Sequence, residues 1–119
     1  MDELIIFSRN GIAKVFVSEG VFYDYGGRPL AFLDNKNIVS YSGKHLGWFH
    51  DGYIRDERGD AVGFTEGARG GPITPIPAIP PIPPIPAIPP IPPISPIPPI
   101  PPIFSLSWSS RTLEEFFIV

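Results

Sequence analysis

The chain has 119 residues, no cysteine and a formal net charge of −3, from nine basic and twelve acidic residues. This length allows one small domain together with a proline-rich segment. The absence of cysteine excludes disulfides and thiolate metal sites, and the acidic balance argues against a nucleic-acid partner. The opening MDELIIFSRNG lacks the basic region and long apolar run of a signal peptide, so we expect a cytoplasmic protein.

The first 67 residues contain four copies of a sixteen-residue pattern. Each copy has a glycine at its centre, and these glycines are Gly11, Gly27, Gly43 and Gly59. Five places after them stand the aromatic residues Phe16, Phe32, Trp48 and Phe64. Five places before them stand Ile6, Phe22, Ile38 and Ile54. Coincident spacings of this kind indicate internal repetition.

Each copy is predicted to form a β-hairpin. Asn10-Gly11 between two β-prone runs is a strong signal for a hairpin turn, and glycine readily adopts the positive φ that such turns require. Further turn residues lie between the copies, so we expect a meander of eight short strands with no helix among them. Because single hairpins are marginally stable, the four must share a core.

The pattern also predicts the two faces of the sheet. We expect the residues five places before and five places after each glycine to form the shared interior. Four places after the glycines stand Val15, Ala31, Gly47 and Gly63, which should lie on the opposite face. Three places before the glycines stand the short acceptors Ser8, Asp24, Ser40 and Asp56, which should accept hydrogen bonds from turn N–H groups.

Residues 72–103 contain seventeen of the eighteen prolines and an isoleucine at every third position from Ile73 to Ile103. Proline excludes an α-helix or a central strand here and favours polyproline II, which has three residues per turn. All eleven isoleucines therefore share one edge of a rod, which would be roughly 100 Å long if straight. A membrane span is disfavoured because polyproline II leaves its backbone polar groups without internal partners.

The isoleucine edge is interpreted as an association surface, since the simplest alternative, a flexible spacer, needs no apolar stripe. The residues proposed for the contact are Ile79, Ile82, Ile85, Ile88, Ile91, Ile94 and Ile97. We expect them to pack against protein, either a groove of the β-domain or rods and barrels of sister chains. Because a straight rod is much longer than a strand of five or six residues, most of the stripe would need partners beyond its own barrel.

Residues 104–119 form a separate element with an apolar end. Thr112 and Glu115 have the spacing of a helix capping box. Leu113, Phe116 and Phe117 would share one helical face, although a strand is the competing prediction for EFFIV. This segment is interpreted as a hydrophobic docking element. It reaches another chain if the rod is straight and its own barrel if the rod bends.

The sixteen-residue hairpins, the proline segment of period three and the closing SLSWSSRTLEEFF together resemble the bacterial 4-fold β-flower proteins. The resemblance covers essentially the whole chain. It implies an all-β fold with a shallow pseudo-fourfold β-flower barrel at 1–67, a polyproline II segment at 68–103 and a short helix or strand within 104–119. It also implies a distant similarity to the Tubby C-terminal domain and to phospholipid-scramblase-like proteins, some of which act at membrane lipids.

The sequence contains no convincing catalytic or metal constellation. His45 and His50 lack a third ligand and are interpreted as solvent-facing, and the carboxylates at 24 and 56 as turn residues. We therefore expect no enzyme, cofactor or metal. The leading hypothesis is a non-catalytic binding and assembly module, in which the isoleucine edge and the C-terminal tail contact protein, for example in a homo-oligomer. The alternatives are a peripheral membrane or lipid-binding module, and a carbohydrate or cell-wall binder with Tyr41 and Phe49 as an aromatic platform.

Overall fold

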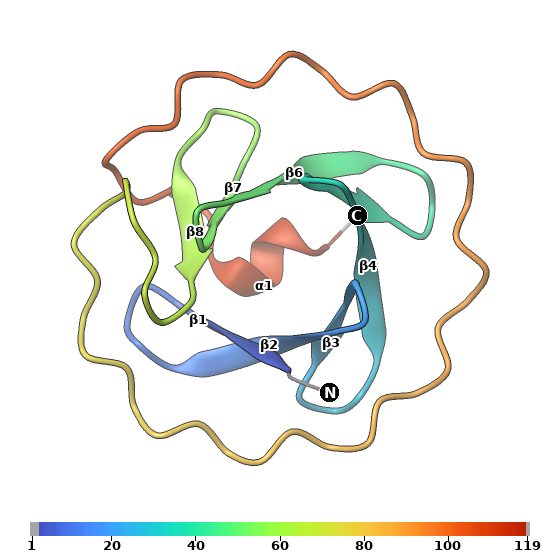
Figure 1. The fold of residues 1–119 in the computed structure, drawn as a ribbon, viewed down its shortest axis with the longest axis horizontal. Coiled ribbons are helices and arrows are strands. Elements are labelled where there is room, and N and C mark those ends of the chain that lie inside the picture. Colours follow the sequence, from blue (N-terminus) through green and yellow to red (C-terminus); the bar gives the residue numbers. More distant parts are fainter. Residues whose placement is uncertain (1–2, 119) are drawn as a thin grey trace.

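The computed structural model describes residues 3–118 as a closed barrel of eight antiparallel strands, with a short helix inside it and a long segment around it (Figure 1). Each strand pairs with the next one in the chain, and the last pairs with the first. The elements are β1 (Leu4–Phe7), β2 (Ala13–Ser18), β3 (Val21–Asp24), β4 (Pro29–Asp34), β5 (Asn37–Ser40), β6 (His45–His50), β7 (Tyr53–Arg55), β8 (Ala61–Phe64) and α1 (Leu113–Phe116). The predicted all-β meander is confirmed, and the C-terminal element is a helix.

The four hairpins, numbered 1 to 4 in chain order from β1–β2 to β7–β8, have the same turn. In hairpin 2, Gly27 N donates to Asp24 O at 3.0 Å and Asp24 N donates to Arg28 O at 3.1 Å, and equivalent pairs occur in the other three. The central glycines have φ between 81° and 91°, namely Gly11, Gly27, Gly43 and Gly59. A residue with a Cβ is strained at such angles, so the predicted hairpin turns and the need for glycine are both confirmed.

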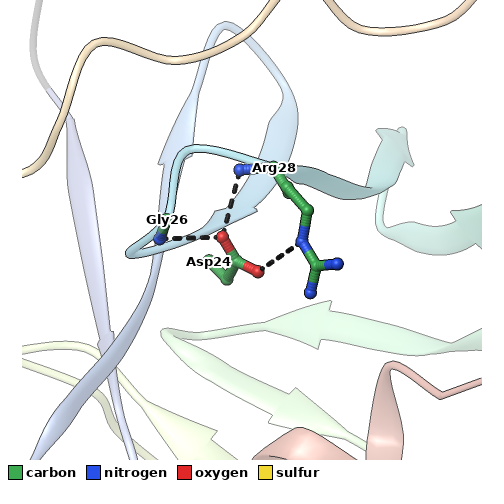
Figure 2. Close-up of polar contacts among 3 residues, drawn as sticks. All are labelled: Asp24, Gly26 and Arg28. Carbon is green, nitrogen blue, oxygen red and sulfur yellow. Dashed lines mark hydrogen bonds and ion pairs between the residues drawn. The ribbon is translucent and has the colours of Figure 1, made fainter.

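Short polar side chains accept hydrogen bonds from turn N–H groups in hairpins 2 to 4, as predicted, whereas the Ser8 hydroxyl accepts none within residues 3–118. Figure 2 shows hairpin 2, where the Asp24 carboxylate accepts from the backbone N–H groups of Gly26 at 2.9 Å and Arg28 at 3.0 Å. Asp56 accepts in the same way from the N–H groups of Arg58 and Asp60 in hairpin 4. These two carboxylates are thus engaged with their own turns, which is the ordinary role of an aspartate at this position.

The interior of the barrel is an apolar core built from every strand pair and from the C-terminal end of the chain. Its buried members are Ile6, Val15, Phe22, Ala31, Ile38, Leu46, Ile54, Val62, Leu113, Phe116 and Phe117. The residues five places before each glycine therefore face inward, as predicted. The small residues four places after it also face inward, so their predicted position on the opposite face is wrong.

The reason for this correction is the helix. A Cβ on Gly47 would clash with the backbone carbonyl of Arg55 and would also lie 3.0 Å from the ring of Phe116. One on Gly63 would lie 3.0 Å from Ile6 and from the Phe7 carbonyl, and 3.1 Å from Leu113. Real Cβ atoms tolerate such distances poorly in a close-packed interior. The small side chains thus provide the space that α1 occupies.

The aromatic residues five places after the glycines lie on the outer face of the barrel, which contradicts the predicted interior position. Because side chains alternate along a strand, Phe16 must face outward when Val15 faces inward. Phe16 stacks on Tyr23 with ring centroids 5.2 Å apart, and Phe64 stacks on Phe7 at 5.5 Å. Three of the four, Phe16, Trp48 and Phe64, are nevertheless buried, and Phe32 is half-buried. They form a second apolar layer outside the strands.

Helix α1 closes the interior of the barrel as a plug (Figure 1). The predicted capping box is confirmed: Thr112 Oγ1 accepts from Glu115 N at 3.1 Å, and Glu115 Oε1 accepts from Thr112 N at 2.8 Å. Leu113 and Phe116 are at most 1% exposed, and Phe117 packs on Phe22. Of the two predicted outcomes, docking on its own barrel is therefore the one that the tail adopts, and docking of these three side chains on another chain is wrong because their own barrel buries them.

Residues 72–103, called the proline ring below, encircle the barrel (Figure 1). The whole molecule measures 36 × 35 × 23 Å, which excludes a straight rod. A contour of roughly 100 Å corresponds to a circle about 32 Å across, which matches this outline. A straight rod is thus excluded, and the bent path is the one observed. The predicted contour length of roughly 100 Å fits the circumference of the ring. Because the ring returns to its starting point, residues 104–118 reach the barrel of the same chain.

Candidate functional site

The proline ring places a proline side-chain carbon near the turn glycine at the tip of each hairpin. A Cβ on the turn glycine would lie 3.3 Å from the Pro75 ring at hairpin 1, and 3.8, 4.0 and 3.1 Å from Pro84, Pro93 and Pro102 at hairpins 2 to 4. These prolines are nine residues apart, which equals three isoleucine spacings. Each sixteen-residue hairpin is thus matched by nine residues of ring. At hairpins 1, 2 and 4 a Cβ would also lie within 3.1 Å of the carbonyl oxygens of Ile76, Ile85 and Ile103, so glycine is needed there for close approach as well as for its φ. At hairpin 3 only its φ requires glycine.

Backbone hydrogen bonds fix this register at three of the four tips. Ala78 N donates to Gly11 O at 2.8 Å, and Ala87 N donates to Gly27 O at 3.0 Å. At the fourth tip, Ser105 N donates to Gly59 O at 3.0 Å. The equivalent residue at the third tip is Pro96, which has no N–H to donate. Ala78, Ala87 and Ser105 thus supply donors at three tips, whereas the interruption at Ser95 supplies none among the described residues.

The two ends of the ring meet at Arg55, a residue that the sequence reasoning missed. Its side chain is 1% exposed, and it donates to Ser105 O at 2.6 Å, Gly59 O at 3.0 Å and Gly70 O at 3.0 Å. The guanidinium also lies 5.0 Å from the centre of the Tyr53 ring. Burial lowers the pKa of Arg55, while Tyr53 and the neighbouring aspartates oppose that shift. A signal was present: the other three copies have Phe7, Tyr23 and Val39 at this position.

The outer edge of the ring is a continuous apolar band, which we call the isoleucine girdle. Its eleven isoleucines are 92–97% exposed: Ile73, Ile76, Ile79, Ile82, Ile85, Ile88, Ile91, Ile94, Ile97, Ile100 and Ile103. No charged residue occurs between the first and the last of them. The predicted single apolar edge is confirmed. The predicted packing of this edge into a groove of the β-domain is wrong. Prolines and backbone groups contact the hairpin tips, and because the isoleucines recur every third residue, all of them then face outward.

The remaining candidates from the sequence lie apart from the girdle. His45 is only 7% exposed and its Nε2 lies 2.9 Å from Asn37 Oδ1, so the prediction of a solvent-facing side chain is wrong for this residue. His50 is half-buried beside Asp51. Within the described part of the chain, no three potential metal ligands gather. Phe49 packs against the barrel interior, so it does not form an exposed aromatic platform.

A family model described as "4-fold beta flower protein" matches residues 5–117. The chain belongs to the 4-fold beta flower family. The match extends over the hairpins, the proline ring and α1, so the predicted resemblance is confirmed for all three segments. No curated protein and no solved structure is significantly similar to this β-flower chain. Among residues 3–118, no helix has the length and apolar character needed to cross a membrane.

Proposed function

We propose that this β-flower protein is a non-catalytic association module, and that the isoleucine girdle is the surface with which it binds protein. The observation that carries the proposal is the exposure of all eleven isoleucines in one uncharged band. By area, each isoleucine offers roughly 60–120 Å² of apolar burial, or roughly 700–1,300 Å² for the girdle. The largest apolar patch of a typical monomer measures about 300–600 Å², so the girdle is larger than an ordinary surface requires.

Further copies of the same chain are the simplest partner. Every part of the girdle has the same isoleucine spacing of about 9 Å, so the isoleucine side chains of one copy fit between those of another copy. The girdle is convex, so the girdles of two touching copies curve away from each other. One isoleucine spacing from the point of contact, the gap between them is already about 5 Å. Only two or three isoleucines from each copy can therefore touch.

The small size of one such contact predicts the mode of association. Five isoleucines bury on the order of 300–600 Å² in total, whereas stable interfaces usually bury about 1,200 Å² or more. A discrete dimer held at one point of the rim would thus be weak. We expect association that grows with concentration, in which each copy contacts several neighbours around its rim.

Sedimentation velocity of the full chain from micromolar to millimolar concentration tests the proposal. The variant Ile79→Ser/Ile85→Ser/Ile91→Ser/Ile97→Ser should remain monomeric, while the wild type associates as concentration rises. The same four positions changed to Val retain the apolar band and should behave like the wild type. Equal sedimentation of wild type and Ser variant would contradict the proposal. A wild type that stays monomeric but floats with lipid vesicles would instead support the lipid-binding alternative.

A further inference from the structure

The barrel departs from its fourfold pattern at the seam between β8 and β1. Strands β2 and β3 are joined by four residue pairs, as are β4 and β5, whereas β8 and β1 share only the pair Phe7–Phe64. Ala61 of β8 pairs instead with the closing segment: Ala61 N donates to Ser107 O at 3.0 Å, and Ser109 N donates to Ala61 O at 2.7 Å. The seam is thus filled by a segment from outside the repeats. Departures from an otherwise regular pattern are often functional.

A cavity of about 290 Å³ lies at this seam, between hairpin 1 and residues 108–114. Three cationic side chains line it, Arg9, Lys14 and Arg111, together with the carboxylate of Glu114. Glu114 forms an ion pair with Lys14 at 3.2 Å. The charges of the side chains that line the cavity sum to +2, from three cations and one anion, on a chain whose net charge is −3. Such a local reversal of sign concentrates small anions.

The hydrogen-bond donors at this cavity are largely free. Arg9 lies over the Trp108 ring at 5.7 Å and donates to no other residue within 3–118, so the N–H groups at its edge remain available. Arg111 uses one terminal nitrogen to donate to Glu115 O at 3.2 Å. The cavity is also lined by the hydroxyls of Ser8 and Ser110. Guanidinium groups with free edges bind phosphate and carboxylate oxygens in a bidentate manner.

We propose that this seam pocket binds a small multivalent oxyanion of the phosphate or polycarboxylate class. The volume is at the lower end of the range for ligand pockets, about 300–1,000 Å³, which suits a compact anion better than a large cofactor. The Trp108 ring forms one wall, so a bound anion changes the surroundings of an indole. The proposal is independent of the girdle, because no isoleucine of the girdle lines the pocket.

Titration of the full chain with inorganic phosphate, and separately with citrate, tests the proposal by calorimetry and by Trp108 fluorescence. For fluorescence, Trp48→Phe leaves Trp108 as the single reporter, and phenylalanine already occupies this position in the other three repeats. We expect saturable binding with a Kd of about 1 mM or tighter for at least one of the two anions. The anion that binds more tightly identifies phosphate or carboxylate chemistry.

Arg9→Gln and Arg111→Gln should each weaken that binding by about tenfold or more, since each removes a charge-assisted contact. Lys44→Gln removes one exposed positive charge from hairpin 3, away from the pocket, and should leave the affinity for the anion unchanged. Circular dichroism confirms that the variants are folded. The proposal is overturned if neither anion binds saturably to the wild type, or if the two arginine variants bind as well as Lys44→Gln does.

Discussion

Arg55 and Ser105 are fifty positions apart in the chain, yet the guanidinium of one donates to the backbone carbonyl of the other at 2.6 Å. The same guanidinium donates to Gly70 at the opposite end of the proline ring. One buried side chain therefore joins the start of the ring to its end. The ring is held closed at this point as well as by its contacts with the hairpin tips.

Replacing Arg55 by Met should lower the free energy of unfolding by about 2 kcal/mol or more, because the carbonyls of Ser105 and Gly70 lose their donor, while that of Gly59 keeps only Ser105 N. Arg55→Lys keeps the charge but lacks the planar fork that reaches both ends of the ring, so it should recover only part of the loss. Urea denaturation provides the measurement, with exposed Arg58→Met as the control. A loss below about 1 kcal/mol for Arg55→Met would show that the ring closes without this residue.

The third hairpin tip predicts a stabilising change. Pro77-Ala78 and Pro86-Ala87 place an N–H opposite their glycines, whereas Ser95-Pro96 does not. The double variant Ser95→Pro/Pro96→Ala should supply the missing donor to Gly43 O and raise the free energy of unfolding by about 1 kcal/mol. Ala87→Pro, which removes an existing donor, should have the opposite effect. Unchanged or lower stability of the double variant would refute the nine-residue register at this tip.

The fit of the plug inside the barrel predicts coupling between Gly63 and Leu113. A Cβ at position 63 would lie 3.0 Å from Ile6 and 3.1 Å from Leu113, so Gly63→Ala should lower the free energy of unfolding by about 1–3 kcal/mol. Leu113→Ala alone should cost about 2–5 kcal/mol. In the double variant the smaller side chain at position 113 makes room for the added Cβ. The loss of the double variant should therefore be at least about 0.5 kcal/mol smaller than the sum of the two single losses. Strict additivity would place Gly63 away from the plug.

His45 predicts a pH dependence of stability. Burial lowers the pKa of this imidazole, with Glu57 opposing the shift, so the unfolded chain binds the proton more readily than the folded one. The free energy of unfolding should be highest above the unfolded pKa of about 6.5 and should fall as the pH is lowered through it, by at most about 1.4 kcal/mol per pH unit.

Chemical denaturation at a series of pH values between about 7.5 and 5.5 measures this slope. His45→Gln should flatten it, and His50→Gln, at a half-buried site next to an aspartate, provides the matched control. A slope that persists in His45→Gln and disappears in His50→Gln would contradict the assignment.

The hairpins could be predicted from the sequence because their determinants are local. A glycine at positive φ, a short acceptor three places before it and a fixed period specify each turn without reference to the rest of the fold. The assignment of faces failed because alternation gives two faces but does not say which one is inside. That choice depends on α1, which is encoded about fifty residues after the barrel ends.

The ring and its closure depend on contacts between distant residues, which is why the sequence left a straight and a bent rod open. Polyproline geometry fixes a contour length but not a curvature, and the curvature comes from the hairpin tips. Some evidence was present in the sequence: Ala78 and Ala87 interrupt the proline pattern nine residues apart, and Ser105 follows the pattern eighteen residues after Ala87. Arg55, at a repeat position that is apolar or aromatic in the other three copies, was a second indication of the ring, and it lies where the two ends of the ring meet.

The fixed ratio of nine ring residues to one sixteen-residue hairpin has a consequence for how such a chain can change in evolution. Duplicating one hairpin would widen the barrel and leave the ring too short to reach every tip. Lengthening the ring alone would leave it slack at the tips. A fivefold relative would therefore need two simultaneous insertions, at separate places in the gene. The number of hairpins is thus resistant to the single duplications by which most repeat proteins grow.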